Sequence, residues 1–265
     1  MKKLLIALFF SSIAFSQSVN NTTITYVANS GFLLSGGGNN ILIDALFNEG
    51  FGQYDPPSDS LIKLMVDKVT PFNNVDLYLV THNHGDHFYA PLVSDFLKEH
   101  FESILVSSNE VCDQVKDKNI HKKHVKGISL SVGEYSDTVF NGIPLKIFRL
   151  KHTGDSTGVQ ITDFAFLIDL NGVKIFHPGD ITFEWDKSIL EKFNLEKENI
   201  DIMFIPYFDL SEASAKYIKE VIKPKNIVAI HFPPKEFKEA SKKFLEVYPG
   251  GIVLEKPMDT KIILN

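Results

Sequence analysis

Short runs of β-branched and aromatic residues, separated by glycine and asparagine, follow the first twenty positions of the chain. They cover residues 23–27, 31–35 and 40–44, and the glycine-rich segment 36–39 has the composition of a hairpin turn. The pattern predicts an antiparallel meander at the start of the fold.

Helical and strand periodicities then alternate. Apolar residues at Leu61, Leu64 and Met65 predict a helix over residues 60–69, and a compact apolar strand follows at 75–80. The same reasoning predicts helices at 91–100 and 109–115 and a strand at 103–106. Such alternation is typical of a sheet covered by helices.

The segment between the meander and the first helix, residues 45–59, is rich in Gly, Pro, Asn and aromatic residues. It is long enough for a functional lid. Its Phe47, Phe51 and Tyr54 either line a pocket or pack into the core, and the sequence leaves both readings open.

A second sheet is predicted from a nearly continuous series of strand-like runs. These runs lie at residues 128–132, 137–140, 144–151, 159–170 and 173–176. Alternation then returns, with strands expected at 202–205, 226–230, 252–254 and 261–264, the last at a sheet edge, and helices at 211–222 and 235–247. Two sheets with helices outside predict one domain over residues 17–265.

The N-terminus is typical of a secretory signal peptide over residues 1–16. Lys2 and Lys3 precede an unbroken apolar run, and Ala14-Phe15-Ser16 offers a small-x-small cleavage site. The apolar run is shorter than the roughly 20 residues of a membrane span, so no stable membrane anchor is expected after cleavage. The sequence predicts an exported protein, periplasmic or extracellular.

Charge and cysteine content narrow the function classes. The formal charge is −6, and removal of residues 1–16 takes away two lysines and no acid, giving −8. Arg149 is the only arginine, so the chain has little capacity to bind a polyanion, and nucleic acid is not expected as a partner. Cys112 is the only cysteine and cannot form a disulfide within the chain.

The strongest chemical signal is the run Thr81-His82-Asn83-His84-Gly85-Asp86-His87 after an apolar strand. Residues two apart in an extended segment point the same way, so His82 and His84 can converge on one cation. Gly85 then lets the backbone turn and directs Asp86 and His87 toward a second point. Two such points close together are typical of a binuclear hydrolytic centre.

Three further metal-capable residues end apolar strands. His152 closes the strand-like run 144–151, Asp180 follows the run 173–176 and His231 follows the run 226–230. Active sites of layered sheets gather at such strand ends, so these residues are candidates to join the cluster.

As a set, these residues resemble the metallo-β-lactamase superfamily. The motifs stand in the family's order: Asp44, the His82–His87 cluster, His152, Gly179-Asp180 and His231. The resemblance implies an α/β fold, a four-layer αββα sandwich of mixed sheets with helices on the outer faces.

The same resemblance implies a ligand set for two divalent cations. One would be bound by His82, His84 and His152, the other by Asp86, His87 and His231, with Asp180 bridging both and Asp44 orienting the ligands. We expect Asp86 to take part in catalysis as well as in metal binding.

Nitrogen and oxygen ligands of this kind favour Zn²⁺, with Fe or Mn as alternatives. A water held between two cations can lose its proton near neutral pH and attack a carbonyl or phosphoryl centre. The predicted activity is therefore hydrolysis of an ester, lactone or phosphodiester in a small-molecule substrate. Tyr207, after the predicted strand 202–205, is a candidate substrate-binding residue.

Departures from subfamily patterns narrow this prediction. Asp180 stands where thiolate-containing lactamases have Cys, which disfavours antibiotic hydrolysis. His84 stands where flavin-linked diiron members have Glu, which disfavours oxidoreduction. Residues 26–32 are similar to the start of ascorbate-phosphate lactonase-type hydrolases, but Asn29 stands near a position where those proteins often have histidine.

Two other readings remain open. Gly154-Asp155-Ser156-Thr157-Gly158 matches the nucleophile elbow of serine hydrolases, with Asp180 and His231 following in triad order, although the next segment is strand-like and the elbow requires a helix. Alternatively, an exported protein could use the same ligands for metal binding without catalysis.

Overall fold

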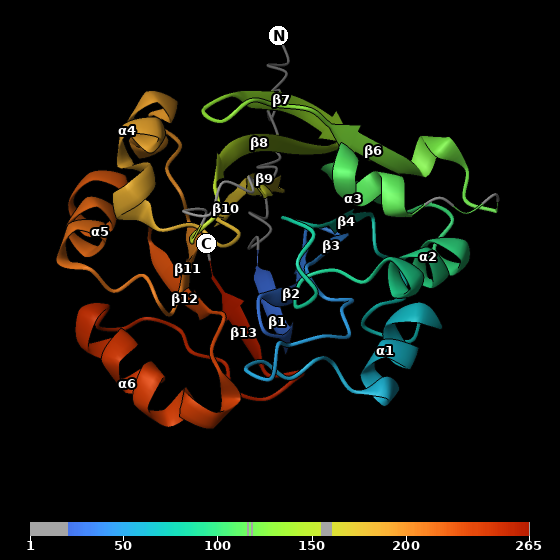
Figure 1. Ribbon diagram of the computed structural model, residues 1–265, viewed down its shortest axis with the longest axis horizontal. Coiled ribbons are helices and arrows are strands. Elements are labelled where there is room, and N and C mark those ends of the chain that lie inside the picture. The colour runs from blue at the N-terminus through green and yellow to red at the C-terminus, as the bar shows by residue number, and fades with distance from the viewer. Residues whose placement is uncertain (1–20, 116, 118, 155–160, 265) are drawn as a thin grey trace, which may run out of the picture.

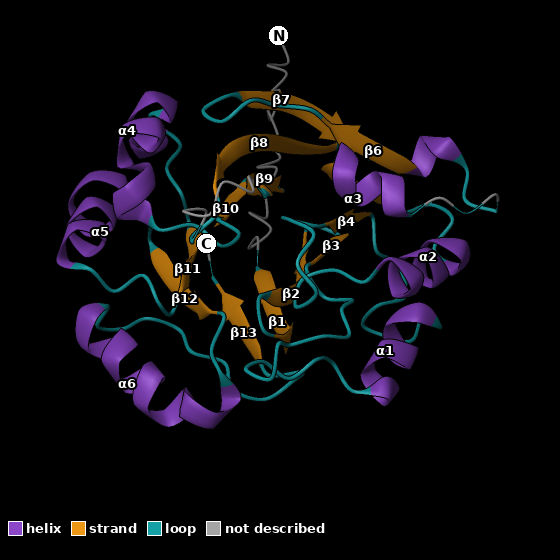
Figure 2. Ribbon diagram, viewed as in Figure 1, coloured by secondary structure: helices purple, strands orange, loops and turns teal. Residues whose placement is uncertain are grey.

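The computed structural model describes residues 21–115, 117, 119–154 and 161–264. Two sheets pack face to face, and one group of helices covers the outer face of each, as Figures 1 and 2 show. The predicted four-layer αββα sandwich is confirmed.

The first sheet has seven strands in the order β13-β1-β2-β3-β4-β5-β6. Their bounds are β1 Thr22–Ala28, β2 Gly31–Gly36, β3 Asn39–Ile43, β4 Leu77–Leu79, β5 Ile104–Ser108, β6 Val125–Ile128 and β13 Thr260–Ile263. The meander β1–β3 is antiparallel, whereas β3 to β6 run parallel. Gly37 and Gly38 both have positive φ in the β2–β3 turn, as a tight hairpin requires.

The second sheet has six strands in the order β12-β11-β10-β9-β8-β7. Their bounds are β7 Tyr135–Phe140, β8 Ile143–Lys151, β9 Thr162–Leu170, β10 Val173–His177, β11 Ile202–Pro206 and β12 Asn226–Ile230. Strands β7 to β10 are antiparallel and β10 to β12 are parallel.

The α-helices of the described residues fall into two groups, one on each sheet (Figure 1). Those on the first sheet are α1 Asp59–Val66, α2 Ala90–Glu99 and α3 Asn109–Gln114; those on the second are α4 Phe183–Phe193, α5 Glu212–Lys216, continued by a π-helical turn at Tyr217–Ile222, and α6 Phe237–Val247. Ser58, Ser108 and Ser211 cap α1, α3 and α5 by accepting a backbone N–H. Among the described residues, none of the helices combines the length and apolar character needed to cross a membrane.

Strand β9 shows how the layers are formed. Phe164, Phe166 and Ile168 pack into the core between the two sheets, whereas Ala165 and Leu167 pack into the core under α4–α6. A strand buried on both faces reads as a continuous apolar run because both of its neighbours are apolar layers.

Two predicted strands and one helix that was not predicted mark the main differences between the sequence analysis and the structure. The run 128–132 is not a strand of the second sheet: β6 ends at Ile128, and a turn with Gly133 at positive φ carries the chain across to β7. Residues 252–254 form only a single bridge, from Ile252 to Val228. Helix α4 was not predicted, although its buried residues Phe183, Ile189, Leu190 and Phe193 have helical spacing.

Candidate metal centre

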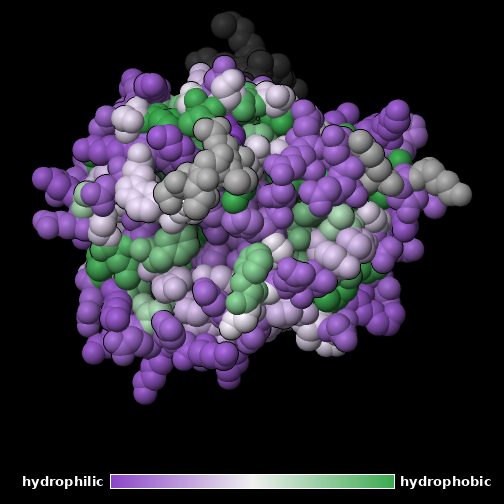
Figure 3. All heavy atoms as spheres, in the orientation of Figure 1, coloured by the Kyte–Doolittle hydropathy of each residue, from purple (hydrophilic) through white to green (hydrophobic). Residues whose placement is uncertain are grey.

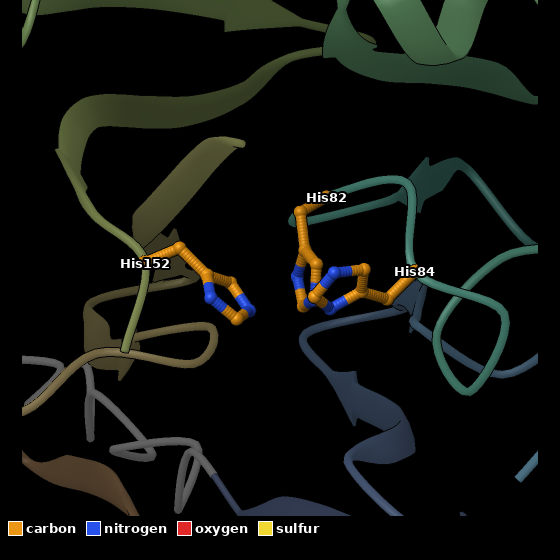
Figure 4. A group of neighbouring side chains, drawn as sticks. All are labelled: His82, His84 and His152. Atoms are coloured by element: carbon orange, nitrogen blue, oxygen red, sulfur yellow. The ribbon is translucent and has the colours of Figure 1, made fainter. Parts of the chain in front are cut away.

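The seven predicted donor residues come together at one edge of the sandwich. Residues 82–87 follow β4, His152 follows β8, Asp180 lies beyond β10 and His231 follows β12. Figure 4 shows His82 and His84 approaching from one side and His152 from the other, with their rings directed toward one another. The site therefore lies at the seam between the sheets.

His82, His84 and His152 form the first donor set. His82 Nε2 lies 3.1 Å from His84 Nδ1, and the His152 ring centre lies 4.8 Å and 4.5 Å from those of His82 and His84. One ring nitrogen from each residue falls within 4.8 Å of the other two, a spacing that can hold one metal ion.

Asp86, His87 and His231 form the second donor set. His231 Nε2 lies 3.3 Å from His87 Nε2 and 3.4 Å from Asp86 Oδ2, and His87 Nε2 lies 3.7 Å from Asp86 Oδ2. All three side chains are buried.

Asp180 contacts both sets through a single oxygen. Its Oδ2 lies 2.9 Å from His231 Nε2 and 3.3 Å from His87 Nε2. The same atom lies 3.9 Å from the Nε2 atoms of His82 and His152. This is the placement expected of a carboxylate shared by two cations.

Asp44 holds the segment that follows β4 and carries donors of both sets. Its carboxylate accepts the backbone N–H of Thr81 at 2.8 Å and the Thr81 hydroxyl at 2.7 Å, and it lies 3.0 Å from His87 Nδ1. A hydrogen bond from His87 Nδ1–H to this carboxylate leaves Nε2 free for a metal. The orienting role implied for Asp44 agrees with this geometry.

Asn29 supports the second set, a role that the sequence left undefined. Its Nδ2 donates to both Oδ2 and the backbone carbonyl of Asp86, each at 3.1 Å. The backbone carbonyl of Asn29 accepts the backbone N–H of His231 at 3.3 Å. Asn29 occupies the β1–β2 turn with φ of 49°, a left-handed conformation that asparagine tolerates better than most residues. It thus joins two donors that are distant in the chain.

The charges of the two sets differ. Burial lowers the pKa of His82 and His152, which favours the neutral, metal-binding form. Burial also acts to lower the pKa of His231, but the Asp180 and Asp86 carboxylates outweigh it and raise that pKa to about 9. The pKa of His87 is likewise raised, because Asp180 and Asp86 outweigh burial.

These residues fit a pair of divalent cations. His152 Nε2 and Asp180 Oδ1 are buried without a hydrogen-bond partner in the described part of the chain, which is costly unless another group satisfies them. Imidazole nitrogens and carboxylate oxygens suit Zn²⁺, Fe and Mn.

Aromatic residues surround the donors. The Phe51 ring, 59% exposed, has its centre 6.1 Å from that of His84, and the Tyr54 and Phe208 ring centres lie 4.3 Å and 5.5 Å from that of His231. Phe47, in contrast, is completely buried in the core under α1–α3. Figure 3 shows that the face seen in Figure 1 is mostly hydrophilic at its edge and carries smaller hydrophobic patches.

Tyr207, the predicted substrate-binding residue, follows β11 directly. Its hydroxyl is hydrogen-bonded to that of Tyr54, and its ring packs 5.6 Å from the Phe232 ring. It therefore lies beside the donors as part of the aromatic rim. Ser156, the nucleophile of the alternative reading, lies outside the described residues.

A four-layer αββα sandwich with seven metal-capable side chains at its seam defines the metallo-β-lactamase class of fold. Residues 23–231 match the family model described as "Beta-lactamase superfamily domain", and the chain belongs to this family.

Curated relatives carry the name UPF0173 metal-dependent hydrolase. The protein of Pelotomaculum thermopropionicum is 24% identical over 82% of this chain and 90% of its own length, and that of Pyrococcus abyssi is 26% identical over 66% and 77%.

Solved structures with the same fold include the metallo-β-lactamase fold protein YhfI from Bacillus subtilis, with a TM-score of 0.61 and 17% identity over 92% of this chain and all of the other. The metallo hydrolase Igni18 from Ignicoccus hospitalis has a TM-score of 0.58 and 20% identity over 92% of this chain and 98% of the other. At this level of identity these structures establish the fold.

Proposed function

We propose that this protein is an exported hydrolase that uses two divalent cations to cleave an ester, lactone or phosphodiester bond. The observation that carries the proposal is the position of Asp180 Oδ2, in contact with Nε2 atoms of both donor sets. The names of the curated relatives support metal-dependent hydrolysis.

When bound, two such cations supply Lewis acidity and a water of lowered pKa. The protein's own residues hold the donors in place: Asp44 fixes the His87 ring, and Asn29 fixes the Asp86 carboxylate. Two donor sets that share one carboxylate would place two cations close together, the arrangement in which a water and a substrate oxygen can be held between the ions. Zn²⁺ is the proposed metal, with Fe or Mn as alternatives.

The aromatic rim favours a substrate with an apolar part. Phe51 and Tyr54 come from the β3–α1 loop and contact one donor set each, while Tyr207 reaches the rim from the other sheet. A phenol hydroxyl at this position can donate a hydrogen bond to a substrate oxygen.

The test combines metal analysis with a substrate panel. Protein purified without chelator is expected to contain about two metal equivalents per chain and to hydrolyse at least one chromogenic lactone, ester or phosphodiester. Chelation abolishes the activity and Zn²⁺ restores it. Activity that survives complete metal removal would refute the proposal.

A serine hydrolase is the second enzymatic reading. Its elbow requires a helix after Ser156, whereas the next described element is strand β9, and both candidate partners, Asp180 and His231, belong to the donor cluster. Ser156→Ala is therefore expected to leave activity unchanged. Inactivation by Ser156→Ala with the metal content intact would favour the serine mechanism.

Metal binding without catalysis is the alternative from a different class. Structural zinc sites usually hold one isolated ion, whereas two donor sets here lie side by side and share Asp180, the arrangement typical of binuclear hydrolytic centres. Turnover that disappears in His84→Ala separates an enzyme from a metal-binding protein.

Export is proposed from residues 1–16, which lie outside the described residues. The mature protein is expected to begin at Gln17 and to be found outside the cytoplasm. N-terminal sequencing of protein from the cell exterior or periplasm tests this directly.

A further inference from the structure

Asp163 is a buried carboxylate beside the metal centre to which the sequence assigned no role. It is the second residue of β9, and its side chain is completely buried. It belongs to neither donor set.

The two carboxylate oxygens of Asp163 face donors from different halves of the site. Oδ2 accepts the backbone N–H of Asp180 at 3.0 Å. Oδ1 has no hydrogen-bond partner in the described part of the chain and lies 3.8 Å from His82 Nδ1, which is itself 3.0 Å from Thr81 Oγ1. Asp163 therefore contacts the shared carboxylate residue and one member of the first donor set.

The backbone around Asp163 ties the sheets together at the same point. The N–H of Phe164 donates to the carbonyl of Thr81, the residue before His82, at 3.0 Å. Arg149 Nη1 donates to the carbonyl of Asp163 at 3.3 Å. The start of β9 is thus fixed against both halves of the site.

Gly179 makes room for this carboxylate. It has φ of +67°, and a Cβ atom there would lie 2.2 Å from Asp163 Oδ1. Asp180 can come this close to Asp163 only because the preceding residue has no side chain.

Burying a carboxylate with one unsatisfied oxygen is costly unless opposite charge lies nearby. A serine or asparagine would accept the Asp180 N–H without that cost. Two divalent cations held by the neighbouring donors would supply the missing positive charge.

We propose that Asp163 is a positioning residue between the two sheets: it orients Asp180 through the backbone N–H, and its second oxygen packs against the His82 ring. Asp44 contacts only residues that follow β4, whereas Asp163 lies between Asp180 of one sheet and His82 of the other, as Asn29 does between His231 and Asp86. This inference rests on the proposed two-cation function.

The experiment titrates metal-free protein with Co²⁺ and resolves two dissociation constants by absorption spectroscopy. Asp163→Ala removes both contacts and is expected to weaken both binding steps by about 10–100-fold. Asp163→Asn keeps an acceptor for Asp180 but places an amide N–H₂ toward His82 Nδ1. It should weaken mainly the step assigned to the first donor set.

Asp209→Asn is the matched control. Asp209 is also buried, accepts one backbone N–H, from Phe183 at 2.7 Å, and has an unpartnered Oδ1. Denaturant unfolding of the metal-free variants measures the purely structural cost. The control should lose stability without a change in either Co²⁺ constant.

The outcomes separate the two proposals. Wild-type protein that binds fewer than two equivalents contradicts the two-cation function and this inference with it. Two equivalents bound with unchanged constants in both Asp163 variants, or equal weakening in Asp209→Asn, overturns the role of Asp163 alone. If Asp163→Ala does not fold, the split between the two steps in Asp163→Asn decides.

Discussion

The two donor sets lie side by side, yet they are held in different ways. In the second set, Asp44 contacts His87, while Asn29 contacts both Asp86 and the backbone of His231. In the first set, Thr81 Oγ1 lies 3.0 Å from His82 Nδ1, and His152 Nε2 has no hydrogen-bond partner among the described residues, as is also true of His231 Nδ1 in the second. Asp44 and Asn29 thus contact each member of the second set, and Thr81 contacts His82 in the first.

The sets differ in charge as well. The second contains a carboxylate and two imidazoles whose pKa values are raised, whereas burial lowers the pKa of His82 and His152 in the first. Near neutral pH, protons should therefore compete with a metal ion for the second set but not for His82 and His152 of the first.

Asp180→Ala should have the largest effect, because it removes the side chain that the two sets share. Loss of a residue that only hydrogen-bonds to a metal ligand typically costs up to about 100-fold in activity, and the loss here should be larger. Binding of both metal ions should be weakened. Metal analysis and steady-state kinetics on the same preparation check this. Loss of one equivalent only would assign Asp180 to a single set.

Asn29→Ala tests whether the second set is indeed held by the protein. It is expected to weaken the ion of that set by about 10–100-fold and to leave the other unchanged. Asn226→Ala is the control, since Asn226 Nδ2 also donates to a carbonyl, that of Asp201 at 3.0 Å, away from the site. Equal weakening of both ions would remove the distinction between the sets.

Proton release should distinguish the sets by pH. His231, with a pKa of about 9 in the metal-free protein, carries a proton at pH 7.5 and must lose it to bind a metal. Affinity of the second set should therefore rise by up to about tenfold per pH unit as pH increases toward 9. Calorimetry in buffers of different ionisation enthalpy counts the protons, and none is expected from His82 or His152.

Tyr54→Phe should have the smallest effect. It removes the hydrogen bond to Tyr207 but keeps the ring beside His231. The free energy of unfolding should fall by about 1 kcal/mol, with metal content unchanged. Denaturant unfolding measures this, and a lost metal equivalent would show that the rim supports the second set directly.

The sequence allowed much of this site to be predicted because its donors stand at strand ends or at fixed spacing. His82 and His84 are two apart after an apolar strand, and Asp180 and His231 follow others. Two sheets with helices outside followed from the strand and helix patterns, and the four-layer αββα order was implied by the family resemblance.

Asp163 and the role of Asn29 could not be predicted, since each depends on a partner far away in the chain. Asp163 reads as an ordinary polar residue at the start of a strand, and only the packing of β9 against Thr81 brings it to the site. Helix α4 was not predicted, although its buried apolar residues have helical spacing.

The contact between His87 and His231 joins points 144 residues apart in the chain. Cys112, the only cysteine, is buried and forms no disulfide. An ion coordinated by both histidines would act as a reversible cross-link around that long loop, so occupancy should slow unfolding and protect the protein from proteases. Metal supply would then govern how long the molecule survives as well as what it does.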